Sequence, residues 1–144
     1  MNINWQQGSL VEIEITDLTS TGDGLGRVDN RVIFVPNTVT GDRVSIKLTQ
    51  VKSNYAQGKI QQILEPSNYR IRSRCIVADK CGGCQWQHIE YEYQLEAKRQ
   101  QVIDALQRLG GFTEIEVEPT LHTATPLNYR NKATYPLARS TTCL

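Results

Sequence analysis

The chain has 144 residues, a net charge of +1 and 39% hydrophobic residues, which fits one ordinary folded domain or two small ones. Its first residues lack the basic and apolar regions of a secretion signal, and no stretch approaches the roughly 18 apolar residues that a membrane-spanning helix needs. These features argue against a disordered or membrane-spanning chain. We expect a cytoplasmic protein with no membrane partner.

The first third of the chain has the pattern of a small β-barrel. Apolar and polar residues alternate over 11–16 and again over 44–49, which is the period of a half-buried strand. The segment 28–32 predicts a two-residue hairpin turn that leads into the apolar run 32–35. A last strand is expected over about 55–64. Five short strands with no helix between them predict a mainly β, OB-like barrel.

Three glycines fall in the segment Gly22-Asp-Gly-Leu-Gly26. Their spacing differs from that of a phosphate-binding G-x-G-x-x-G loop, and the residues after them predict a strand rather than a helix. We expect these glycines to supply turn and bulge conformations.

Positive charge is concentrated after the predicted barrel. Residues 1–65 contain six Lys and Arg against seven Asp and Glu, whereas residues 66–144 contain ten against eight. Arg70, Arg72 and Arg74 are spaced by two, so in an extended segment they share one face and could reach successive phosphates. We predict that they bind RNA, although the spacing alone fits a solvated charge run equally well.

Three of the four cysteines lie within ten residues of one another, as C-x5-C-x2-C at Cys75, Cys81 and Cys84. In a reducing compartment such a group favours metal binding over disulfides. Zinc would take a fourth ligand and could use His88, which makes a Cys3His site. A [4Fe–4S] cluster would use three or four thiolates. The spacing leaves both metals open.

A helix is predicted over 90–109, ended by Gly110 and Gly111. Its apolar residues form one stripe that we expect to face a core. The stripe consists of Tyr91, Leu95, Val102, Leu106 and Leu109.

Three segments of the predicted barrel, Thr19–Val28, Val32–Pro36 and Thr40–Val44, resemble the TRAM domain, a small RNA-binding β-barrel of RNA-modifying enzymes. The resemblance covers roughly Gly8 to Pro66. Phe34 is expected in the core because it lies in a continuous apolar run. The other side chains that the barrel offers to RNA are Arg27, Arg31, Arg43, Lys47, Lys52, Lys59 and Tyr55.

The segment Cys75–Tyr91, together with Tyr93–Lys98, is similar to the iron–sulfur signature of the bacterial RNA (uracil-5-)-methyltransferases. Pro126–Lys132 resembles the segment that leads into their central, RNA-facing region. Many members carry an N-terminal TRAM domain before the signature, which is the order found here. The two modules together resemble the 23S rRNA (uracil-5-)-methyltransferases in particular.

This resemblance implies a [4Fe–4S] cluster held by Cys75, Cys81 and Cys84. It also implies RNA contacts at Arg130 and Lys132, with 23S rRNA as partner and no DNA partner. The family's fourth cluster cysteine lies further downstream than Cys143, which is therefore left out of the ligand set.

The expected organisation is a TRAM barrel over 8–66, a small α+β iron–sulfur region over 67–112 and the start of an RNA-facing region over 113–144. The family's Rossmann-like domain, which binds S-adenosylmethionine and supplies the catalytic cysteine and carboxylate, is absent from this sequence. We therefore expect RNA and cluster binding without methyl transfer by this chain alone.

Two other functions compete with this one. A stand-alone RNA-binding module with a Cys3His zinc site is the main alternative. Radical methylthiotransferases of tRNA also carry TRAM domains, but they use C-x3-C-x2-C, and the first gap here is five residues.

Overall fold

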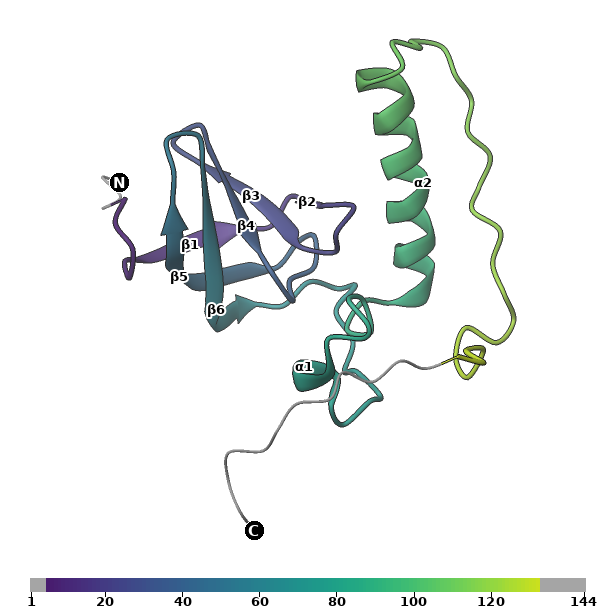
Figure 1. Ribbon diagram of the computed structural model, residues 1–144, viewed down its shortest axis with the longest axis horizontal. Coiled ribbons are helices and arrows are strands. Elements are labelled where there is room, and N and C mark those ends of the chain that lie inside the picture. The colour runs from purple at the N-terminus through teal and green to yellow at the C-terminus, as the bar shows by residue number, and fades with distance from the viewer. Residues whose placement is uncertain (1–4, 133–144) are drawn as a thin grey trace.

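The computed structural model describes residues 5–132. A barrel comes first and is followed by a short helix α1 (Ala78–Cys81) and a long helix α2 (Tyr91–Arg108) (Figure 1). The predicted fold class, a mainly β barrel followed by a small region with one long helix, is confirmed. No helix within 5–132 is both long enough and apolar enough to cross a bilayer. The strands are β1 (Leu10–Glu14), β2 (Asp17–Leu18), β3 (Gly24–Val28), β4 (Arg31–Val35), β5 (Arg43–Val51) and β6 (Tyr55–Glu65).

The strands form one sheet in the order β1-β5-β6-β4-β3-β2, with β4 and β6 parallel and the other neighbours antiparallel. The sheet has six strands rather than the five predicted, because the chain changes partner after β1: β1 pairs with β5, whereas β2 pairs with β3. One continuous stretch therefore supplies both edges of the sheet. Gly26 of β3 allows β1 to approach closely, since a Cβ there would clash with the carbonyl oxygen of Glu14.

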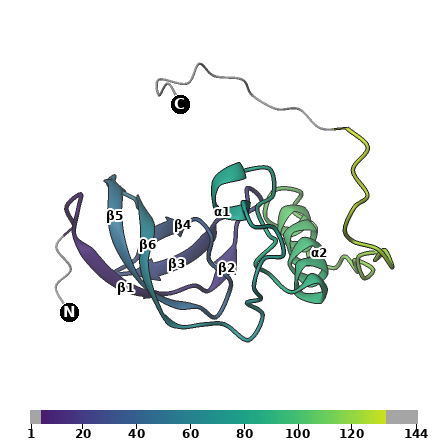
Figure 2. The same ribbon diagram turned by 90° about the horizontal axis from the view of Figure 1, so that it is seen from below.

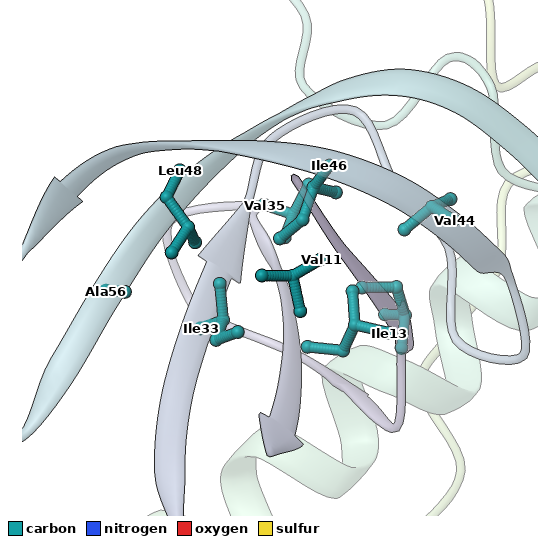
Figure 3. Close-up of a cluster of buried hydrophobic side chains, with 9 residues drawn as sticks. Val11, Ile13, Ile33, Val35, Val44, Ile46, Leu48 and Ala56 are labelled. Atoms are coloured by element: carbon teal, nitrogen blue, oxygen red, sulfur yellow. The ribbon is translucent and has the colours of Figure 1, made fainter. Parts of the chain in front are cut away.

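The barrel interior is filled by aliphatic side chains from β1, β4, β5 and β6 (Figure 3). The predicted alternation holds: Val11 and Ile13 are buried, and the residues on either side of each face outward. The buried set is Val11, Ile13, Ile15, Ile33, Val35, Val44, Ile46, Leu48 and Ala56. Burial of this apolar area is the main stabilising contribution to the barrel.

Phe34 was expected in this core, and that expectation is wrong. Ile33 and Val35 on either side of it are fully buried, so the alternation of β4 turns Phe34 to the outer face, where it is half-buried. A run of apolar residues hides the period of two and does not reveal which of its members face outward.

The predicted hairpin is present between β3 and β4. Asp29 and Asn30 both have positive φ, at 47° and 63°, as a type I′ turn requires. Of the three clustered glycines, only Gly22 has the turn conformation, with φ of 99°. Gly24 provides space instead, because a Cβ there would lie 1.9 Å from the hydroxyl of Thr38.

Helix α2 is one residue shorter at each end than the predicted 90–109. None of its residues is fully buried, so the prediction that its apolar stripe faces a core is wrong. The face that packs on the barrel holds Tyr93 and Ala97, against a second buried cluster of Leu18, Val39 and Ile89.

After α2 the chain returns alongside the helix (Figure 1), and Tyr91 of the predicted stripe contacts it, since the Tyr91 hydroxyl accepts from the Thr123 N–H at 3.1 Å. Arg99 Nε donates to the Val117 carbonyl at 2.8 Å, and Thr120 Oγ1 donates to the Leu95 carbonyl at 2.9 Å. The returning segment covers the stripe only in part. Val102 remains 48% exposed.

Candidate functional site

The three cysteines lie on one loop, residues 72–87, which we call the cysteine loop. Its two ends are joined by backbone hydrogen bonds from Ile71 to His88 (2.9 Å) and from Glu90 to Tyr69 (2.8 Å). The Tyr69 ring also stacks on Tyr93 of α2, with the ring centroids 4.0 Å apart. The cysteine loop is thus closed at its base, and Figure 2 shows it around α1, between the barrel and α2.

The thiols differ in exposure. Cys75 is half-buried, and its backbone N–H donates to Ser73 Oγ, which in turn donates to Gln87 Oε1 at 2.8 Å. Cys81 ends α1 and is exposed, as is Cys84. All three are free thiols.

Three thiols on one short loop are suitable ligands for a soft, thiophilic metal ion or an iron–sulfur cluster. The chain ends α1 with Gly82 in the left-handed conformation, and Cys84 lines an open hollow of about 230 Å³ between the cysteine loop and the barrel. Within 5–132 no three metal-binding side chains already converge on one point. The structure therefore places the three cysteines on one loop without bringing their sulfurs together.

Two residues of the cysteine loop pack directly against the barrel. The Trp86 indole Nε1 donates to the Gly22 carbonyl at 3.2 Å, and the ring packs against the buried cluster of Leu18 and Ile89. Gly22 is close enough to the loop that a Cβ would lie 2.7 Å from Gln85 Cβ. Trp86 accordingly has a packing role.

Arg70 occupies a different position from the one predicted. Its Nε donates to Asp42 Oδ1 at 3.0 Å and its Nη2 to the Asn37 carbonyl at 2.9 Å, and the Arg70 side chain is only 16% exposed. Arg72 and Arg74 are exposed. The three arginines therefore do not form one exposed basic face, because the guanidinium of Arg70 is bound to the barrel.

Asp42 is fully buried and holds this junction together. It also accepts hydrogen bonds from the backbone N–H groups of Val39 (2.7 Å) and Ser67 (2.9 Å). Burial raises the pKa of Asp42, but the hydrogen bonds from Arg70, Ser67 and Val39 outweigh burial and hold that pKa below its ordinary value. The carboxylate is ionised at neutral pH and pairs with Arg70.

His88 also faces the barrel, with Nε2 3.2 Å from the Thr38 carbonyl. Burial lowers the pKa of His88, the Arg70 charge lowers it further, and the hydrogen bond to Thr38 opposes both. A neutral ring that donates from Nε2 fits this environment, and that nitrogen is then engaged by the barrel rather than by the cysteines.

The remaining predicted residues lie further along the chain. Arg130 and Lys132 are exposed, in a segment without helix or strand. Cys143 lies outside the described residues. The side chains that sequence reasoning missed are those that join the barrel to the cysteine loop, because no sequence signal pairs Asp42 with Arg70 or Thr38 with His88.

Comparison with known proteins defines the class of the barrel. Residues 4–60 match the TRAM domain family, so the predicted TRAM domain is confirmed in this part of the chain.

Longer relatives match almost the whole of this chain. It is 66% identical over 138 residues to a protein named an uncharacterized RNA methyltransferase from Nostoc sp., and 59% identical over 138 residues to one from Synechocystis sp.. Each match covers 96% of this chain and 30% of the relative. The chain contains a TRAM domain and is a close homologue of these proteins, and it spans about 30% of their length.

Among solved structures, the chain is similar to a tRNA (uracil-54, C5)-methyltransferase of Pyrococcus abyssi in complex with S-adenosyl-L-homocysteine. The identity is 30% and the TM-score is 0.43. The match covers 74% of this chain and 23% of that one.

Proposed function

We propose that this chain is the N-terminal, RNA- and cluster-binding part of an S-adenosylmethionine-dependent RNA (uracil-5-)-methyltransferase that acts on 23S rRNA. One observation carries the proposal: a TRAM barrel is joined by hydrogen bonds and packing to a loop with the C-x5-C-x2-C spacing of the family's iron–sulfur signature. The close relatives named RNA methyltransferases support the enzyme class.

Cys75, Cys81 and Cys84 would hold the [4Fe–4S] cluster. Their thiolates are the ligands that such clusters use, and Cys84 lines a hollow beside the barrel. The alternative Cys3His zinc site needs His88, whose Nε2 is engaged by the Thr38 carbonyl. The contacts of His88 therefore give no support to the zinc site.

RNA would bind to the barrel and to the exposed basic residues after it. Arg72 and Arg74 lie at the start of the cysteine loop, and Arg130 and Lys132 lie in the later segment; all four are exposed. Arg70 acts on RNA only indirectly, because its guanidinium binds Asp42.

The proposal is tested by methylation in vitro. The full-length protein of the parent gene and this chain alone are each incubated with unmodified 23S rRNA and methyl-labelled S-adenosylmethionine, and labelled nucleosides are separated. We expect 5-methyluridine from the full-length protein and none from this chain, which has no glycine-rich S-adenosylmethionine loop. Label at another base or carbon, or only in tRNA, would contradict the proposed reaction or substrate.

A further inference from the structure

The barrel has an outer surface that neither its core nor the cysteine loop uses. It runs over β3, β4, β6 and β5 (Figure 1). In the strand pairing, Arg27 of β3 lies opposite Val32 of β4, and Val32 lies opposite Tyr55 of β6. Phe34 of β4 lies one row away, opposite Gln57. We call this surface, with Arg27, Phe34, Tyr55, Lys47 and Lys59, the outer face.

Two aromatic rings meet on the outer face. Phe34 and Tyr55 pack edge to face, with ring centroids 6.0 Å apart and an angle of 66° between the planes. Tyr55 is 37% exposed, and Phe34 is half-buried. Aromatic side chains at the surface of a barrel lose the stabilisation that burial in the core would give, so their position favours a ligand with flat, stackable groups.

Two lysines extend this surface on the neighbouring strands. Lys47 of β5 lies directly opposite Lys59 of β6, and both are exposed. Like charges in directly opposite positions destabilise a sheet. Within residues 5–132 neither lysine forms an ion pair, whereas Arg43 of β5 pairs with both Glu12 and Glu65. An anionic ligand would relieve the repulsion between the two lysines.

Stackable rings beside unpaired cations are the features by which OB-type barrels bind single strands: bases stack on the rings and phosphates lie against the cations. A protein partner would more commonly meet an apolar patch with few lysines. We propose that the outer face binds single-stranded RNA, with bases stacked on Tyr55 and Phe34 and phosphates at Lys47, Lys59 and Arg27. This inference rests on the proposed RNA-binding function and names the surface that performs it.

The test measures binding of the purified 144-residue chain to a fluorescein-labelled uridine oligonucleotide of about 12 nucleotides, within the size that one OB barrel covers. Fluorescence anisotropy is recorded over a series of salt concentrations. The charge variant is Lys47→Gln with Lys59→Gln, and the stacking variant is Tyr55→Ala. The matched control is Lys98→Gln with Arg108→Gln, which removes the same charge from exposed positions on α2.

We expect the charge variant to reduce the slope of log K against log salt by about 1.4, since each lost phosphate contact on a single strand contributes about 0.7. The stacking variant should bind about 5- to 150-fold more weakly with an unchanged slope. The control should bind like the wild type. Circular dichroism checks the fold, and Tyr55→Leu replaces Tyr55→Ala if the latter unfolds.

The outcomes separate the two proposals. If the wild type binds the oligonucleotide and both outer-face variants bind equally well, the outer face is not the RNA surface and this inference is wrong, while RNA binding by the chain stands. If the wild type does not bind RNA at all, the proposed RNA-binding function itself fails.

Discussion

At the scale of single residues, Asp42 is the side chain on which the junction between barrel and cysteine loop depends most. Its carboxylate is fully buried and accepts hydrogen bonds from two backbone N–H groups and from Arg70. A buried ion pair of this kind adds little over well-packed apolar residues, but removal of one partner leaves the other charge poorly compensated. Asp42 is therefore more sensitive to substitution than any surface acid of the barrel.

Asp42→Ala should lower the free energy of unfolding by about 3 kcal/mol. This cost is near the lower limit for removing one partner of a buried ion pair, because the guanidinium of Arg70 keeps some contact with water. Glu65→Ala is the control, since Glu65 also pairs with an arginine but both side chains are more than half exposed. That change should cost less than about 1 kcal/mol. Denaturation with urea measures both, and equal costs would contradict the role given to Asp42.

The same carboxylate should make stability depend on pH in acid. The pKa of Asp42 is lowered in the folded state, so the unfolded chain binds more protons than the folded one as the pH falls, and stability falls with it. The contribution is complete above the ordinary pKa of aspartate, about 4, and is lost as the pH drops through the lower folded value.

Asp42→Asn has no charge to lose. The difference in melting temperature between wild type and Asp42→Asn should narrow as the pH is taken from about 5 to about 2. Thermal unfolding followed by circular dichroism tests this. A difference that stays constant over this range would show that the charge of Asp42 has no part in stability.

At the scale of elements, the turn before β3 and the cysteine loop fit against each other closely. Gly22 has φ of 99° and lies against Gln85, while its carbonyl accepts from Trp86. A side chain at this position faces both backbone strain and a steric clash. The glycine thus belongs to the contact between two elements rather than to a phosphate-binding loop.

Gly22→Ala should destabilise the protein by at least about 1 kcal/mol more than Gly111→Ala. Gly111 also has positive φ, at 71°, but a Cβ there would meet nothing within 4 Å. Comparison of the two variants therefore separates the cost of the steric clash from the cost of backbone strain. Trp86 emission should move to longer wavelength in Gly22→Ala only. Equal destabilisation with unchanged emission would contradict the contact.

Local elements were predictable from the sequence because their signals are local. The alternation at Val11 and Ile13 predicted β1, and the hairpin turn before β4 was placed correctly. The direction of Phe34 was not predictable, because every neighbour in its run is apolar. The apolar stripe of α2 was found, but the face of a helix that packs inward depends on its partners, and here Tyr93 and Ala97 pack on the barrel instead.

The site was predictable only in part. The cysteines and exposed arginines follow from spacing and resemblance, whereas the pairing of Arg70 with Asp42 joins residues 28 positions apart and carries no mark in the sequence. In the sequence, an arginine that pairs with a buried carboxylate therefore cannot be told from one that faces RNA.

At the scale of the whole molecule, the TRAM barrel and the cysteine loop are joined through several independent contacts. Asp42 binds Arg70, Thr38 approaches His88, and Gly22 packs against Trp86. If the proposed function is right, RNA would therefore meet the barrel and the cysteine loop as one unit.

The most direct test of this account is the metal content of the chain, purified without oxygen from cells supplied with iron. We expect about four irons and four acid-labile sulfides per chain, with a brown colour that is lost in Cys81→Ser and Cys84→Ser. One zinc per chain without sulfide would contradict the account and favour a Cys3His site with His88.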